Sequence, residues 1–139
     1  MLEVLDSVLG MLTAAVGALG GISLVVGSVG IFTVMTIAVR ERTGEIGLLR
    51  ALGATRGRIL SLFLLEGTLL AGLGGAAGMA VGLGGAVLIH FFVPLLPVHT
   101  PWSFVVLAEL LAMTIGILAS ALPARQAARL DPLEALRSE

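Results

Sequence analysis

The 139-residue sequence contains no lysine, no cysteine and no tyrosine, and only 12% of its residues are charged. Without cysteine, the chain has no disulfide framework, no thiol chemistry and no Cys-rich metal site. Without lysine, it cannot form the phosphate-binding loop GxxxxGK[ST], so ATP hydrolysis by that chemistry is excluded. The net charge of −1 gives no support to nucleic-acid binding. We therefore expect neither catalytic residues nor a bound cofactor or metal ion in this chain.

Hydrophobic residues, in contrast, make up 58% of the chain, whereas a soluble domain has about 45–50%. A soluble fold could not hide that much apolar surface, but a bilayer can. A membrane-spanning helix needs about 20 mostly apolar residues. Three stretches meet this requirement: residues 16–39, 59–93 and 102–122. The sequence predicts an all-α membrane protein in which residues 1–139 form a single transmembrane domain with three transmembrane helices.

Shorter elements are expected at both ends of the chain. Four leucines within residues 1–15 share one helical face: Leu2, Leu5, Leu9 and Leu12. This pattern predicts an N-terminal lead-in helix that either lies at the membrane interface or extends the first span. Pro123 is expected to end or kink the third span. In the tail 123–139, the motif DPLE at 131–134 resembles a capping box and predicts a short cytoplasmic C-terminal helix at about 132–138.

The arginines predict how the chain is oriented. Five lie in residues 40–58 and three in the tail 123–139, whereas residues 94–101 contain none. Because cytoplasmic loops are enriched in Lys and Arg, we expect the segment 40–58 and the C-terminus in the cytoplasm and the N-terminus outside. The second apolar stretch is longer than one crossing needs, so Glu66 is expected at the level of the lipid headgroups.

Small residues recur every four positions in the second span. This spacing lets apolar helices approach closely in lipid. The glycines expected to take part in helix packing are Gly67, Gly74, Gly75, Gly78 and Gly82. The pattern fits general membrane packing, and it fits a tight dimer or a larger partner equally well.

The segment 40–58 mixes charged and apolar residues on several helical faces. Apolar residues such as Ile46 and Leu49 persist between the charges, whereas a helix lying on a membrane surface has two clean faces. Docking against a protein therefore fits the segment, and so does a solvated loop that only sets the topology. Residues 53–55 are expected to form a turn, with Thr55 as the N-cap of the next helix.

Four stretches resemble the FtsX-like permease family of ABC transporters, in particular its macrolide-exporter type. They are ISLVVGSVGIF at 22–32, VRERTGEIGLLRALGATRGRIL at 39–60, FLLEG at 63–67 and PARQAARLDPLEALRSE at 123–139. The two cytoplasmic motifs are long, stand in the right order and are separated by a Gly-rich span. The match covers nearly the whole chain, but only the C-terminal part of a typical family member.

The resemblance implies a permease subunit or fragment of the bacterial inner membrane that couples a cytoplasmic ABC ATPase to export or mechanical work outside the cytoplasm. ATP would bind to that partner ATPase. The chain would form a homodimer or pair with a missing permease half, surrounded by membrane lipid. The segment 40–58 would be a coupling segment resting on the ATPase. Its implied contact residues are Glu41, Arg42, Glu45, Ile46, Leu49, Arg50, Ala51, Leu52, Gly53 and Ala54.

Typical family members also carry a further transmembrane helix and a large extracytoplasmic domain. The chain is therefore expected to be a fragment, a subunit whose other half is a separate chain, or a reduced member.

Two other functions stay open. An intramembrane carboxylate is a functional candidate by default, so Glu109 could serve a small proton-coupled exporter, although pairing with a hydroxyl or backbone group explains it as well. Alternatively, a non-transport membrane adaptor could recruit a soluble partner through the segment 40–58.

Overall fold

The computed structural model describes residues 2–93 and 102–130. These residues contain no strand and form four α-helices: α1 (Leu2–Glu41), α2 (Thr43–Ala51), α3 (Arg56–Phe92) and α4 (Trp102–Arg129). α1, α3 and α4 are each long and apolar enough to cross a membrane. The predicted all-α fold with three transmembrane helices is thereby confirmed. The predicted helix at 132–138 and its capping box lie outside the described residues.

The N-terminal lead-in is not a separate element, because α1 runs without a break from Leu2 to Glu41. Of the two predicted arrangements, extension of the first span is the one observed. No proline interrupts this stretch, and its hydroxyls donate within the helix, as Thr13 Oγ1 does to Leu9 O (2.9 Å). The 40 residues of α1 give a rod of about 60 Å, roughly twice the hydrocarbon thickness of a bilayer.

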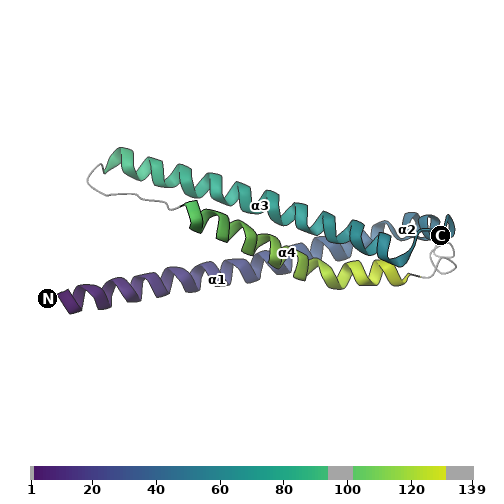
Figure 1. Ribbon diagram of the computed structural model, residues 1–139, viewed down its shortest axis with the longest axis horizontal. Helices are drawn as coiled ribbons and strands as arrows, with labels where there is room; N and C mark the ends of the chain where they lie inside the picture. Colours follow the sequence, from purple (N-terminus) through teal and green to yellow (C-terminus); the bar gives the residue numbers. More distant parts are fainter. Residues whose placement is uncertain (1, 94–101, 131–139) are drawn as a thin grey trace.

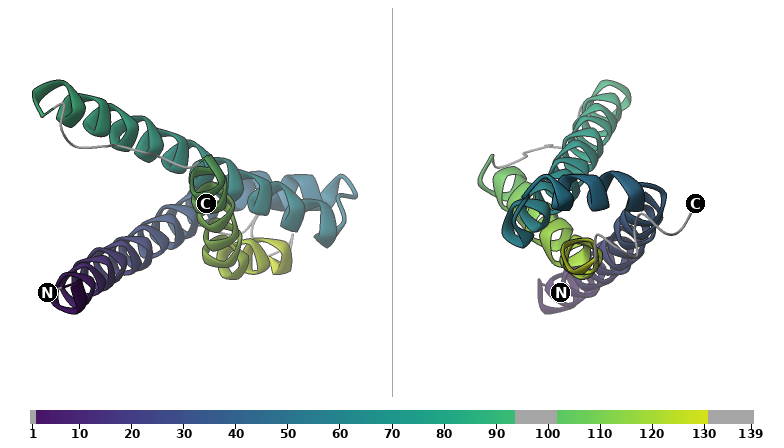
Figure 2. Two further views of the ribbon diagram at one scale, coloured as in Figure 1. Left: turned by 60° about the vertical axis from the view of Figure 1, so that its left-hand side comes forward. Right: turned by 90° about the vertical axis from the view of Figure 1, so that its right-hand side faces the viewer.

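The three long helices converge at the end of the molecule that holds α2 (Figures 1 and 2). α3 and α4 run antiparallel and pack closely along much of α4, and α1 packs mainly against α4. α1 and α3 spread apart with distance from α2. The C-terminal ends of α1 and α4 and the N-terminal end of α3 therefore lie together, beside α2.

The end of the third span differs from a simple stop, because Pro123 lies inside α4. Proline has no N–H to donate to the carbonyl of Ala119, and its ring crowds that carbonyl. Ser120 Oγ donates to Gly116 O (2.8 Å), a type of bond that often bends helices. α4 changes direction between its green and its yellow half (Figures 1 and 2). The helix is therefore kinked and continues to Arg129.

Small residues form the seam between α3 and α4. A Cβ added to Gly67 would overlap the side chain of Ser120, and a Cβ added to Gly116 would overlap that of Ala71. The same Cβ on Gly116 would lie 3.2 Å from Gly67 O. Backbones approach this closely in lipid only where side chains are small, so these positions determine how tightly α3 and α4 can pack.

The main buried hydrophobic cluster lies at the end that holds α2, and all four helices contribute to it. Its members are Met35 and Val39 of α1, Ile46 of α2, Ile59 and Phe63 of α3, and Ala124, Ala127 and Ala128 of α4. Many apolar side chains elsewhere on the long helices are exposed, which suits helices surrounded by lipid. The best-packed part of the protein is therefore where α2 meets the three spans.

Candidate functional site

The C-terminal end of α2 is closed by a Schellman motif. Gly53 adopts φ +94°, a left-handed conformation that favours glycine. The Gly53 N–H donates to Arg50 O (3.0 Å), and the Ala54 N–H donates to Leu49 O (2.9 Å), which is the bonding pattern of that motif. The chain therefore turns from α2 into α3 with its terminal carbonyls satisfied.

The starts of α2 and of α3 are also defined by local hydrogen bonds. α1 and α2 are separated by Arg42 alone (φ −99°, ψ 17°), and Thr43 Oγ1 donates back to Arg40 O (2.8 Å). Thr55 is the N-cap of α3, and its side chain accepts a bond from the Arg58 N–H (3.4 Å). The predicted N-cap and turn are thus confirmed, while the segment 40–58 proves to be mostly helical.

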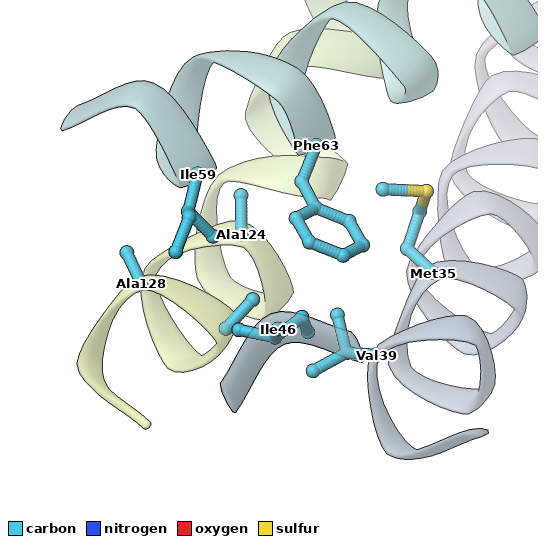
Figure 3. Close-up of a cluster of buried hydrophobic side chains, with 8 residues drawn as sticks. Met35, Val39, Ile46, Ile59, Phe63, Ala124 and Ala128 are labelled. Carbon is cyan, nitrogen blue, oxygen red and sulfur yellow. The ribbon is translucent and has the colours of Figure 1, made fainter. Parts of the chain in front are cut away.

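The inner side of α2 is anchored by Ile46, which is only 2% exposed. Figure 3 shows its side chain among Val39 of α1, Phe63 of α3 and Ala124 of α4. Ile46 is one of the contact residues that the family resemblance implies. The structure places its side chain inside the chain's own core, so it can support a docking surface but does not form one.

Arg50 links α2 to the end of α4. Its Nη1 donates to Ala128 O at 2.9 Å, and the bond is partly buried. The last carbonyls of a helix have no partner within the helix and carry a partial negative charge. The guanidinium therefore satisfies one of these carbonyls and holds α2 against α4. Sequence reasoning did not find this link, because the two residues are 78 positions apart.

A second charged link joins the start of α2 to α3. Arg42 Nη1 lies 3.4 Å from Glu66 Oε1, and the two side chains are 48% and 32% exposed. Because ion pairs this exposed contribute only about 0–1 kcal/mol, the pair orients α2 more than it stabilises the fold. Sequence reasoning placed Glu66 at the headgroup level and Arg42 on the ATPase, and it did not pair them.

The outer side of α2 and of the turn that follows is apolar. Leu48, Leu49 and Leu52 are 55%, 47% and 78% exposed. The implied contact residues fall into two groups. Those that are exposed are Glu41, Arg42, Glu45, Leu49, Ala51, Leu52 and Gly53; those that are buried or half-buried are Ile46, Arg50 and Ala54. Leu48 belongs with the exposed group, and its four-residue spacing from Leu52 is the signal that could have identified it.

The glycines of α3 face different neighbours. Gly67 and Gly75 lie against α4, at Ser120 and Glu109 respectively. Gly74 and Gly78 line an open hollow of about 570 Å³ to which α1, α3 and α4 all contribute residues. A Cβ on Gly74, Gly78 or Gly82 would meet no atom within 4 Å among the described residues. The structure therefore brings two of the five predicted glycines into the seam between α3 and α4 and leaves three with open space.

Glu109 of α4 lies over the backbone of Gly75. Its Oε2 is buried and has no hydrogen-bond partner among the described residues. We considered a hydroxyl or backbone partner for Glu109, and the described residues provide none for its Oε2.

Taken together, these features define a multi-pass membrane protein. The short helix α2 and the turn after it lie at one end of the helix bundle, and this end is rich in arginine. The FtsX-like permease C-terminal family matches residues 17–132, and the chain belongs to this family. The resemblance seen in the sequence is thereby confirmed. The chain thus corresponds to a membrane-embedded permease portion.

Three relatives illustrate the similarity. The chain is 43% identical over 135 residues to the uncharacterized ABC transporter permease YknZ of Bacillus subtilis, a match that covers 97% of the chain and 34% of the relative. It is 41% identical over 134 residues to the macrolide export ATP-binding/permease protein MacB of Rhodopseudomonas palustris strain HaA2 (96% and 20%). It is 45% identical over 132 residues to MacB of Azoarcus sp. strain BH72 (92% and 19%). The chain thus spans about a third of the first relative and about a fifth of the other two.

Proposed function

We propose that this chain is the transmembrane coupling part of an ABC transporter permease, and that α2 is the segment on which a cytoplasmic ABC ATPase rests. One observation supports this most directly. Ile46 is buried where all three spans meet, while Leu48, Leu49 and Leu52 of the same helix–turn segment are exposed. α2 thus has an inner side that contacts the spans and an outer side that is free to bind a partner.

The links of α2 support a mechanical role. Ile46 packs into the shared cluster, Arg50 bonds to the end of α4, and Arg42 pairs with Glu66 of α3. A displacement of α2 by the ATPase would therefore move the ends of the spans with it. ATP is bound and hydrolysed by the partner, and the work is done outside the cytoplasm, as export or as mechanical transmission.

The outer surface has the composition of a protein-binding site. Three leucines form an apolar centre, and charged residues such as Glu41 and Glu45 are exposed beside them. Specific interfaces commonly have such an apolar core and a polar rim. The arginines of this end support its placement in the cytoplasm by the positive-inside rule. The N-terminus is then outside, and the membrane is the bacterial inner membrane.

A further permease helix completes the bundle in this proposal. Gly74 and Gly78 line the hollow between the three spans. A Cβ added to Gly82 would meet no described atom within 4 Å. Small residues of this kind permit close approach of another helix in lipid. That helix belongs to a second copy of the chain or to the remainder of the permease.

A pull-down from native membranes in mild detergent, followed by an ATPase assay, tests the proposal. The unmodified chain is expected to retain an ATPase. Leu49→Asp should release it, because docking would bury an unpaired carboxylate, whereas the apolar Leu49→Met should keep it. Circular dichroism and membrane fractionation confirm that both variants fold and insert. Retention of the ATPase by Leu49→Asp, or its absence from the unmodified preparation, would refute docking at this site.

A further inference from the structure

A second polar feature lies at the same end of the bundle. A hollow of about 230 Å³ is lined by residues of the first turns of α3 and the last turns of α4. Its lining consists of Arg56, Gly57 and Leu60 of α3 and Arg125, Ala128 and Arg129 of α4. All three arginines are exposed, and none of them forms an ion pair with another described residue. Half of the lining is therefore cationic, and the other half is small or apolar.

The helix ends beside the hollow contribute partial charges of both signs. The first N–H groups of a helix carry a partial positive charge, and α3 begins at Arg56. The end of α4 carries the opposite charge, but Arg50 is bonded to its carbonyl at Ala128. A phosphate group suits such a place, because guanidinium groups bind phosphate oxygens through two parallel hydrogen bonds.

The hollow lies at the depth of the lipid headgroups. α4 starts at Trp102, and a hydrocarbon layer of about 30 Å takes about 20 residues, which ends near Leu122. Arg125 and Arg129 then lie about 5 and 10 Å beyond the hydrocarbon boundary, within or next to the headgroup region. Leu60 adds an apolar wall to the hollow, against which the start of an acyl chain can pack.

We propose that this hollow binds the phosphate headgroup of an anionic phospholipid of the cytoplasmic leaflet. Arg56, Arg125 and Arg129 contact the phosphate, and Gly57 leaves the space that the headgroup occupies. Basic pockets between transmembrane helices at this level are known to take such headgroups. The lipid would bridge α3 and α4 beside Arg50, so the base of the bundle would be tied together by a ligand as well as by protein contacts.

The chain offers a matched control for this site. Arg58 lies two residues after Arg56, but it lines a different hollow together with Leu49, Leu52, Gly53 and Ala54. Replacing Arg58 by Gln removes the same charge from the same turn of α3. Any effect specific to the proposed site must therefore be absent from Arg58→Gln and present when Arg125 and Arg129 are changed.

Native mass spectrometry of the purified full chain, mixed with equal amounts of phosphatidylglycerol and phosphatidylcholine, tests the proposal. One phosphatidylglycerol per chain is expected to remain bound at a collision energy that strips phosphatidylcholine. The double variant Arg125→Gln/Arg129→Gln should retain roughly tenfold less, since each guanidinium supplies charge-assisted hydrogen bonds, and Arg58→Gln should retain as much as the unmodified chain. Equal retention of the two lipids by the unmodified chain, or equal losses in both arginine variants, would overturn the proposal.

Two further experiments test whether binding requires the shape of the hollow and not only its positive charge, and whether the ligand is a lipid and not a free anion. Gly57→Phe keeps every arginine and adds a large side chain at the lining of the hollow, where a Cβ would meet no described atom within 4 Å; it should abolish retention of phosphatidylglycerol. Millimolar inorganic phosphate should not displace the lipid, and displacement would assign the site to a free phosphate instead. Circular dichroism checks that each variant is helical. If the double variant misfolds, the lipid comparison on the unmodified chain still decides. No ATPase takes part, so the result is independent of the proposed function.

Discussion

Replacing Gly116 by Ala adds one methyl group at the tightest part of the α3–α4 seam. There, a new Cβ would overlap the Cβ of Ala71 and lie 3.2 Å from the carbonyl oxygen of Gly67. Neither group is the end of a flexible side chain, so α3 and α4 must move apart. Over-packing of a well-packed interior costs about 1–3 kcal/mol, while the higher helix propensity of alanine offsets up to about 1 kcal/mol.

Gly85→Ala is the matched control, because it is the same chemical change within a long helix. A Cβ at Gly85 meets no described atom within 4 Å, so only the propensity gain remains. The difference between Gly116→Ala and Gly85→Ala therefore isolates the overlap. We expect that difference to be about 1–3 kcal/mol in the free energy of unfolding, or about 5- to 150-fold in the unfolding equilibrium.

A second substitution identifies the overlapping atom. Ala71→Gly removes the Cβ that the new methyl group would strike, so it should recover part of the stability lost by Gly116→Ala. Recovery should be incomplete, because the Gly67 carbonyl is still close. Unfolding in mixed micelles, followed by circular dichroism during a detergent titration, measures five proteins: the unmodified chain, Gly116→Ala, Gly85→Ala, Ala71→Gly and the double variant Gly116→Ala/Ala71→Gly. Equal stability of Gly116→Ala and Gly85→Ala, together with no coupling to Ala71→Gly, would refute the packing argument.

Three further predictions concern α2 and the contacts at its two ends. Ile46→Ala empties the centre of the buried cluster and should cost about 2–5 kcal/mol in the same titration; a cost below about 1 kcal/mol would show that the cluster closes around the gap. Arg50→Met removes the bond to Ala128 O and should lower the free energy of unfolding by about 1–2 kcal/mol. An unchanged stability would contradict this and show that water already satisfies that carbonyl. Glu66→Gln should cost less than about 1 kcal/mol and lose its effect in high salt, since its pair with Arg42 is exposed; a larger, salt-insensitive loss would contradict this.

Features that depend on neighbouring residues were predictable from the sequence. The three spans follow from apolar runs of membrane length, and the N-cap at Thr55 follows from side-chain chemistry three residues before Arg58. The continuity of α1 was predicted only as one of two alternatives. A helix lying at the interface and a helix extending the span share the same spacing of leucines, so the pattern alone does not separate them.

Features that depend on how helices meet were not predictable. Nothing in the segment 40–58 indicates that Ile46 is buried while Leu49 remains 47% exposed, because the two residues fit one helical face until the positions of α3 and α4 are known. The pairing of Arg42 with Glu66 requires that two helix ends lie side by side. The hollow between Arg56 and Arg125 likewise arises only when the first turn of α3 meets the last turns of α4.

The turn at Gly53 has a mechanical consequence. The left-handed glycine and the N-cap at Thr55 make the connection between α2 and α3 short and hydrogen-bonded, so in the proposed coupling a rotation of α2 would be passed to α3. α3 has 37 residues and is about 55 Å long, so a tilt of about 5° at its base displaces its far end by about 5 Å. If α2 receives the movement, as proposed, the two helices would act as a lever with a short input arm and a long output arm, and a small displacement at one membrane face would become a larger one at the other.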